Sequence, residues 1–287
     1  MNGFQLKFVT PLFKQYEDMR PLREFPHEDL RKIKFILTDI DDTLTTNGRL
    51  PAKSLHALEK LHQAGFKVIP ITGRPAGWCD HFARMWPVDA VVGENGAFYF
   101  IYDHFQRKII RRYWKSKNER KADRKRLEKI QKIILTTVKG SAVSSDQAYR
   151  EADLAIDHCE DVKPLPESSV VQIMDVFLNY GAVAKISSIH VNGWFGDYDK
   201  LKMTRILLEE YFELKDADFM EKIMFLGDSP NDEPMFGYFK NSVGVRNIMN
   251  YADQLEQFPA WITSKNAAEG FSELADTLLS AMMGSKN

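Results

Sequence analysis

The segment KFILTDIDDTLTTNG, residues 34–48, indicates both a fold class and a chemistry. Its apolar run at 35–37 stops at three aspartates within four positions, Asp39, Asp41 and Asp42. Carboxylates this close repel each other, and each one loses hydration energy when it is buried. The three side chains therefore belong either to a solvated loop or to a site that receives a positive group.

Length and composition are those of an ordinary globular protein. The chain has 287 residues, enough for two domains, and is 44% hydrophobic and 28% charged. A net charge of −1 provides no overall field for nucleic acid or an anionic membrane, and no apolar run approaches the ~20 residues of a membrane helix. Two distant cysteines suit a reducing compartment, and the N-terminal region lacks the pattern of a signal peptide. We therefore expect a cytoplasmic protein without nucleic-acid or membrane partners.

The pattern of the first segment recurs along the chain. A helical stretch at 54–65 carries leucines three residues apart, and two more apolar runs, 66–71 and 90–93, end at polar residues. This alternation of strand, helix and strand predicts parallel βαβ units. The expected fold class is therefore α/β, with a Rossmann-like parallel sheet.

The pattern changes in the middle of the chain and then returns. Residues 97–114 predict a hairpin and residues 115–139 a long helix, followed by mixed strand-like and helical stretches. From residue 199 onward the first pattern resumes. The expected parts are an N-terminal extension at 1–31, a core formed by 32–113 and 196–287, and an inserted α+β domain at 114–195.

Polar side chains follow the predicted core strands directly. In a parallel sheet the carboxyl ends of the strands lie at one edge, where open α/β folds bind ligands. The residues expected to meet there are Asp39, Asp41, Thr72, Arg74, Asn95, Asp228 and Asp232. The four aspartates offer hard oxygen donors without a His/Cys cluster, a combination that suits Mg²⁺ and a phosphorylated ligand.

Four short motifs follow one another along the chain in an order that indicates a family. They are DIDDTL at 39–44, TGR at 72–74, Lys200 and GDSPND at 227–232. In order and spacing they resemble the signature motifs of the haloacid dehalogenase superfamily of phosphatases. ENGA at 94–97 and the insert resemble its branch with a large α/β cap, to which sugar-phosphate phosphatases and phosphomannomutase belong. The resemblance covers residues 33–280 and implies a Rossmann-like core, a cap and a Mg²⁺ cofactor.

The resemblance assigns roles to the acidic residues. It makes Asp39 the nucleophile that forms an aspartyl-phosphate, and Asp41 the general acid and base, with its backbone carbonyl on the metal. Asp228 and Asp232 become metal ligands, and Asn231 orients them. The implied metal set is thus Asp39, Asp41, Asp228 and Asp232.

The phosphate-binding residues follow from the same resemblance. Thr72 supplies a hydroxyl, Gly73 a close backbone approach, and a lysine ties the nucleophile to the phosphate. Both Lys200 and Lys202 are candidates, because the glycine that usually follows the family lysine is missing. Asp199 is a good helix N-cap, which favours Lys200.

The sequence leaves four further assignments open. Arg74 pairs either with phosphate or with a neighbouring acid, and Asn95 either lines the site or lies beside it. Arg150 contacts the substrate or forms an ordinary ion pair. His190, Asn192 and Trp194 alternate on one strand face, which is either an interdomain hinge or a sugar-binding surface; Asn192 is the predicted substrate contact among them.

The functional expectation is a Mg²⁺-dependent phosphatase for a small phosphorylated metabolite, most naturally a sugar phosphate. One alternative is a phosphomutase, which needs groups that hold a bisphosphate. Another is a catalytically silent sugar- or phosphate-binding protein, which does not need a nucleophile beside an acid.

Overall fold

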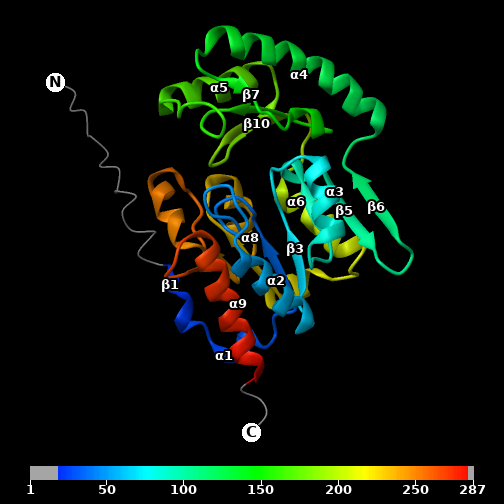
Figure 1. Ribbon diagram of the computed structural model, residues 1–287, viewed down its shortest axis with the longest axis vertical. Helices are drawn as coiled ribbons and strands as arrows, with labels where there is room; N and C mark the ends of the chain where they lie inside the picture. The colour runs from blue at the N-terminus through cyan, green and yellow to red at the C-terminus, as the bar shows by residue number, and fades with distance from the viewer. Residues whose placement is uncertain (1–18, 284–287) are drawn as a thin grey trace, which may run out of the picture.

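Short apolar runs form a six-stranded sheet at the centre of the molecule (Figure 1). The computed structural model describes residues 19–283. The strands, in their order across the sheet, are β1 (Arg20–Pro21), β13 (Trp261–Ile262), β12 (Ser242–Gly244), β11 (Ile223–Gly227), β2 (Phe35–Thr38) and β3 (Lys67–Pro70). All neighbours pair in parallel, as predicted.

The order of these strands creates a topological switch point. From β2 the chain moves to β3 on one side, whereas β11 lies on the other side of β2. Crossover connections therefore diverge between β2 and β11, which leaves a crevice beyond the carboxyl ends of these two strands. Asp39 and Asp228 each follow one of them directly.

Side chains of the strands alternate between two buried layers. In β2, Ile36 packs into one layer, and Phe35 and Leu37 pack into the other. The first layer is covered by α2 (Ala52–Gln63), α3 (Ala76–Met85) and α9 (Ala267–Met283). The second is covered by α6 (Lys200–Glu210), α7 (Asp216–Lys222) and α8 (Glu233–Tyr238). Burial on both faces explains why the strands are continuously apolar in sequence.

A hairpin extends the sheet beyond β3. Residue Ile71 forms a parallel bridge to Val92 in β4 (Val91–Gly93), so β4 continues the parallel order. It then pairs antiparallel with β5 (Phe98–Asp103), which pairs with β6 (Lys108–Tyr113). The hairpin predicted at 97–114 is thus confirmed, and it projects to one side of the core (Figure 1).

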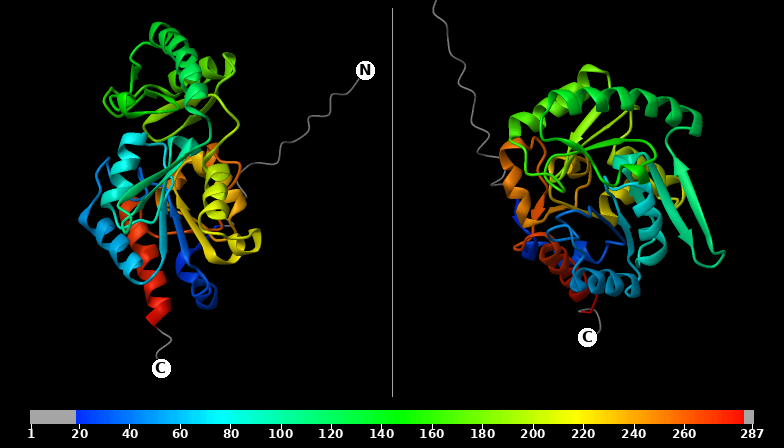
Figure 2. Two further views of the ribbon diagram at one scale, coloured as in Figure 1. Left: turned by 90° about the vertical axis from the view of Figure 1, so that its right-hand side faces the viewer. Right: turned by 45° about the horizontal axis from the view of Figure 1, so that its top comes forward.

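The chain between the hairpin and α6 forms a smaller α+β domain, here called the cap. Its antiparallel sheet has the order β7 (Ala142–Val143), β8 (Leu154–Asp157), β10 (His190–Trp194) and β9 (Val183–Ile186). The helices α4 (Lys117–Thr137) and α5 (Glu167–Asn179) pack on it around a hydrophobic core of its own. The cap lies above the carboxyl ends of the core strands (Figure 2).

The described part of the N-terminal region joins the core. Strand β1 pairs with β13 at the edge of the sheet. A short 3-10 turn and α1 (His27–Leu30) follow, and Leu22, Phe25 and Leu30 are buried against the first layer. The remainder of the predicted extension, 1–18, lies outside the described residues. Within residues 19–283, no helix has both the length and the apolar character required to span a bilayer.

Candidate active site

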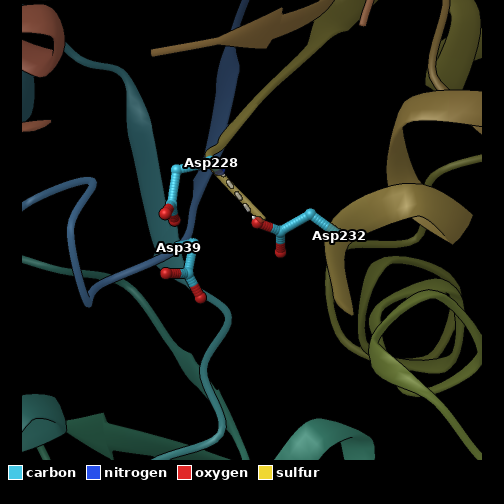
Figure 3. A group of neighbouring side chains, drawn as sticks. All are labelled: Asp39, Asp228 and Asp232. Carbon is cyan, nitrogen blue, oxygen red and sulfur yellow. Dashed lines mark hydrogen bonds between the residues drawn. The ribbon is translucent and has the colours of Figure 1, made fainter. Parts of the chain in front are cut away.

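Three aspartates converge at the switch point (Figure 3). Asp39 follows β2 and Asp228 follows β11, whereas Asp232 ends the short 3-10 turn Pro230–Asp232. One carboxylate oxygen of each lies within 4.8 Å of the others, and all three residues are buried. The structure therefore brings together, from distant parts of the sequence, three of the four aspartates predicted to bind a metal.

A glycine makes this close arrangement feasible. A Cβ at Gly227 would lie 2.4 Å from Oδ2 of Asp232, which is too close for any side chain. That oxygen instead accepts a hydrogen bond from the backbone N–H of Asp228 at 3.0 Å. Thr43 donates to Asp228 Oδ1 at 3.1 Å, so the Asp228 carboxylate is also fixed in direction.

A buried lysine lies among the aspartates. The Lys200 ammonium donates to Oδ1 of Asp39 and to Oδ1 of Asp232, both at 2.7 Å. Lys200 begins α6, which Asp199 caps by accepting a hydrogen bond from the Lys202 N–H at 2.8 Å. Lys202 pairs with Asp197 at the surface instead. Of the two candidate lysines, the structure places Lys200 beside Asp39.

The approach of α6 depends on a second glycine. Gly96, with φ of +103°, lies against the backbone of Asp199. A Cβ at this position would come within 2.0 Å of the Asp199 carbonyl oxygen. The ENGA motif thus serves to admit the helix that carries Lys200.

The site carries an excess of negative charge. Three carboxylates surround one ammonium, which leaves a formal charge of −2 when all are ionised. Burial raises the pKa of Asp39 to about 8; Lys200 opposes this shift, and the charges of Asp232 and Asp41 add to it. Burial also raises the pKa of Asp228 well above its usual range. A divalent cation offsets this charge, and an all-oxygen donor set fits Mg²⁺ better than a softer metal.

The Asp41 carboxylate is directed elsewhere. Arg74 binds it through two nitrogens, with Nε 2.9 Å from Oδ2 and Nη2 2.8 Å from Oδ1. Asp41 is therefore absent from the group of three described carboxylates that could hold a metal. The metal contact predicted for Asp41 is through its backbone carbonyl, and it stays a prediction. Of the two predicted alternatives for Arg74, the structure shows pairing with a neighbouring acid.

The loop after β3 is held tightly in place. Thr72 is buried, and its hydroxyl accepts a hydrogen bond from the Arg74 backbone N–H at 3.0 Å. Gly73 lines the cavity beside Asp39. Asn95 lies against Gly73 without lining the cavity, and its Oδ1 has no hydrogen-bond partner among the described residues. Asn231 lines the cavity and accepts a hydrogen bond from Ser229.

The cap closes over this site. The cavity above Asp39 has a volume of about 20 Å³, close to the room needed by one water molecule. Its cap side is formed by the turn between β9 and β10 and by β10 itself. The lining residues from the cap are Ser187, Ser188, Ile189, His190 and Asn192. Cap and core residues line this small space together, so the described conformation is a closed one.

Arg150 does not occupy the place predicted for it. It is fully buried, pairs with Asp146 at 2.8 Å and Asp153 at 3.0 Å, and donates to the Gly73 carbonyl at 2.9 Å. It is not among the residues that line the cavity. Of the two predicted alternatives for Arg150, the structure shows ion pairs, because neighbouring carboxylates and a carbonyl occupy its guanidinium. Asn192 does line the cavity, and it also donates to Asp153 at 2.9 Å.

Several residues of the site are not among the site residues predicted from the sequence. Glu160 and Asp146 of the cap both approach the Arg74 guanidinium. Glu94 accepts hydrogen bonds from the backbone N–H groups of Ala76 in the core and Glu151 in the cap, at 2.9 and 2.8 Å. Such contacts depend on how the two domains dock. The available signals are the ENGA motif, which contains Glu94, and the acidic residues after β8, in DHCED at 157–161.

Comparison with known proteins fits this geometry. The family model described as haloacid dehalogenase-like hydrolase matches residues 36–189, more than half of the chain. The chain belongs to the haloacid dehalogenase-like hydrolases. The matched region includes Asp39 and Asp41 and extends through most of the cap, so the resemblance proposed from the motifs is confirmed. Among curated proteins, none matches this hydrolase.

Solved structures share the whole architecture of this hydrolase at low sequence identity. A protein of Thermoplasma acidophilum is 16% identical, with a TM-score of 0.65 over 86% of this chain and 98% of the other. A haloacid dehalogenase-like hydrolase from Bacteroides thetaiotaomicron is 14% identical, with 0.58 over 85% and 98%. A sucrose-phosphatase from Synechocystis, in complex with sucrose and phosphate, is 15% identical, with 0.58 over 85% and 97%. These likenesses confirm the predicted fold class, a Rossmann-like core with a cap.

Proposed function

We propose that this hydrolase is a Mg²⁺-dependent phosphatase that acts through an aspartyl-phosphate. The observation that carries the proposal is the position of Asp39, a buried carboxylate at the switch point, held by Lys200 at 2.7 Å. Two more aspartates lie beside it, and an acid fixed by arginine, Asp41, follows two residues later. A site that only binds phosphate would favour donors over a group of carboxylates, which repel it.

The chemistry proceeds in two steps. In the first, an Asp39 carboxylate oxygen attacks phosphorus, the bond from phosphorus to the leaving oxygen breaks, and Asp41, which starts in its protonated form, donates its proton to that oxygen. In the second, Asp41 removes a proton from water, the water oxygen bonds to phosphorus, and the Asp39–phosphorus bond breaks. Phosphate leaves, and both carboxyl groups return to their starting states.

Other side chains support these steps electrostatically. Lys200 keeps one Asp39 oxygen in place and offsets negative charge. The Thr72 and Gly73 loop offers a place for the phosphate oxygens. Asp39, Asp228 and Asp232 would hold Mg²⁺, together with the Asp41 backbone carbonyl; when bound, the ion offsets the charge of the phosphoryl group.

The lining of the cap favours a polyhydroxyl substrate. Ser187, Ser188 and Asn192 offer neutral donors and acceptors of the kind that bind sugar hydroxyls. The sucrose-phosphatase that shares this fold was solved with sucrose and phosphate, which supports the same substrate class. We therefore propose that the substrate is a small sugar phosphate, and that Asn192 is one of its contacts.

The charge of the lining weighs against a phosphomutase. Among the described residues that line the cavity, Arg74 is the one arginine or lysine, and its guanidinium already contacts three carboxylates. A bisphosphate intermediate would need a further cationic group for its second phosphate. The arrangement therefore favours hydrolysis of a monophosphate.

The proposal is tested with p-nitrophenyl phosphate and then with a panel of phosphorylated sugars. We expect Mg²⁺-dependent release of phosphate from the wild-type protein, and none from Asp39→Ala, since no other group is placed to form the covalent intermediate. Asp41→Asn should lower the rate on the order of 10²–10⁴-fold. Wild-type turnover by the Asp39 variant would refute the mechanism, and binding of sugar phosphates without hydrolysis would indicate a silent binding protein.

A further inference from the structure

We propose that Glu160 of the cap is a positioning residue for Asp41 and acts through Arg74, so that the general acid is oriented when the cap is closed. The inference rests on the proposed function, because it gives Asp41 a role in proton transfer. It goes further by assigning a second task to the cap besides selecting the substrate. The contacts between the two domains carry the argument.

A single nitrogen of Arg74 joins the two carboxylates. Its Nη2 donates to Oδ1 of Asp41 at 2.8 Å and to Oε1 of Glu160 at 2.9 Å. Asp41 and Arg74 belong to the core, whereas Glu160 follows β8 in the cap. Since the guanidinium is planar and its donors point in fixed directions, moving Glu160 changes the direction in which Arg74 holds Asp41.

The surroundings of Arg74 restrict how its guanidinium can be oriented. Its side chain is only 4% exposed, and its guanidinium lies over the ring of Trp78 at 4.5 Å from the centroid. On the cap side, Nη1 is 3.7 Å from Asp146 and has no hydrogen-bond partner among the described residues. The core thus supports the plane of the guanidinium, and the tight contact from the cap is the one made by Glu160.

Glu160 itself is held by a preorganised loop. The buried carboxylate of Asp157 accepts hydrogen bonds from the backbone N–H groups of Cys159, Glu160 and Asp161, at 2.9, 2.8 and 2.8 Å. The second carboxylate oxygen of Glu160, Oε2, lies 2.9 Å from His190 Nε2, although the imidazole ring is not aligned for a hydrogen bond. Glu160 therefore moves with the cap as a fixed part of it, and cap closure delivers it to Arg74.

This arrangement gives the closed state a chemical advantage. Opening the cap withdraws Glu160 and Asp146 while Arg74 and Asp41 stay in the core, so the acid loses part of its positioning. Closing restores it at the moment when the substrate is enclosed. Small misplacements of a catalytic group cost up to about 10²-fold in rate, which sets the scale of the expected effect.

The experiment uses the full-length protein with Mg²⁺ and p-nitrophenyl phosphate, which is too small to need specific cap contacts. We expect Glu160→Ala to lower kcat about 10–100-fold while KM changes little. Glu160→Gln should retain most of the rate, because its amide oxygen accepts the same hydrogen bond from Nη2. Glu151→Ala is the matched control, since Glu151 pairs with Arg120 through a side chain that is 46% exposed; it should leave kcat unchanged.

A double-mutant cycle with Asp41→Asn identifies the route of the effect. If Glu160 acts through Asp41, its replacement by alanine should cost little further rate once Asp41 is asparagine. Multiplicative losses would overturn the proposal, as would a wild-type kcat in Glu160→Ala. A wild-type protein that hydrolyses no phosphate ester would refute the proposed function and this role with it, whereas an active wild type with an unaffected Glu160 variant refutes only the positioning role.

Discussion

The Lys200 ammonium lies 2.7 Å from the Asp39 carboxylate, and both groups are buried beyond the carboxyl ends of β2 and β11. The same nitrogen also binds Asp232 at 2.7 Å. Although burial opposes it, the two carboxylates raise the pKa of Lys200 above its usual range, so the group stays charged. Lys200 is thus the fixed positive charge of the site, and the lysine two residues later is not.

Replacing each lysine by alanine separates their roles. Lys200→Ala should lower kcat/KM for p-nitrophenyl phosphate by about 10²-fold or more, because it removes charge stabilisation inside a buried site. Lys202→Ala should leave kcat/KM near the wild-type value, because Lys202 is 41% exposed and pairs with Asp197 at the surface. Steady-state kinetics of both variants checks this. An equal loss of kcat/KM in the two variants would mean that the activity depends on the integrity of α6 and not on the Lys200 ammonium.

Metal binding should appear as a gain in stability. Mg²⁺ binds the folded site and not the unfolded chain, so at 100 times its Kd it stabilises the protein by about 2.7 kcal/mol. For a chain of this size the melting temperature should rise by roughly 5–10 °C. Thermal unfolding with Mg²⁺ and with EDTA measures the shift. A larger shift with Zn²⁺ than with Mg²⁺ would contradict the hard-oxygen assignment.

The same measurement on two variants locates the ion. Asp228→Asn should abolish the Mg²⁺ shift, and should not destabilise the metal-free protein, because it relieves repulsion among buried carboxylates. Asp197→Asn removes a carboxylate that is 94% exposed and should keep the full shift. A Mg²⁺ shift that survives in the Asp228 variant would place the ion elsewhere.

The sequence was informative wherever a backbone rule determines position. Asp39 and Asp228 could be found because parallel strands end at one edge, and Lys200 because Asp199 is a good helix cap. Strand β1 gave no signal, since two residues that include Pro21 cannot show a period; proline is tolerated there because the strand lies at an edge. Sequence rules that act over a few residues therefore find the site residues after strands and at helix caps, and they miss a strand of two residues.

The contacts between cap and core could not be predicted in this way. Glu160 reaches Arg74 across 86 residues of sequence, and nothing in its neighbours specifies that approach. For Arg150 the sequence leaves a substrate contact and an ion pair as alternatives. In the structure its carboxylate partners lie three and four residues away, and they enclose it together with the Gly73 carbonyl.

Arg150 should therefore be a residue on which stability depends. Arg150→Met leaves Asp153 buried without its charge partner and leaves Asp146 only the longer contact with Arg74, and breaking buried pairs typically costs about 3–5 kcal/mol of unfolding free energy. Arg205→Met is the matched control; its surface pairs with Glu209 and Asp216 should contribute less than about 1 kcal/mol. Urea denaturation of both variants tests this. A change at Arg150 as small as that at Arg205 would show that the buried pairs are not needed.

The contact between Glu160 and Arg74 should also give stability a characteristic dependence on pH. Burial opposes the shift, but His190 and Arg74 lower the pKa of Glu160 from 4.5 to about 2. A carboxyl with a lower pKa in the folded than in the unfolded chain stabilises the fold above the unfolded pKa, and this contribution is lost as the pH falls toward the folded pKa.

The wild type should therefore be more stable than Glu160→Gln at pH 7. That difference should shrink between pH 4.5 and 2. Urea denaturation of the two proteins at pH 7, 5, 4 and 3 measures it, with Glu209→Gln, whose side chain is 47% exposed, as the control that should show almost no difference at any pH. A difference that persists unchanged at pH 3 would show that the charge of Glu160 does not stabilise the closed structure.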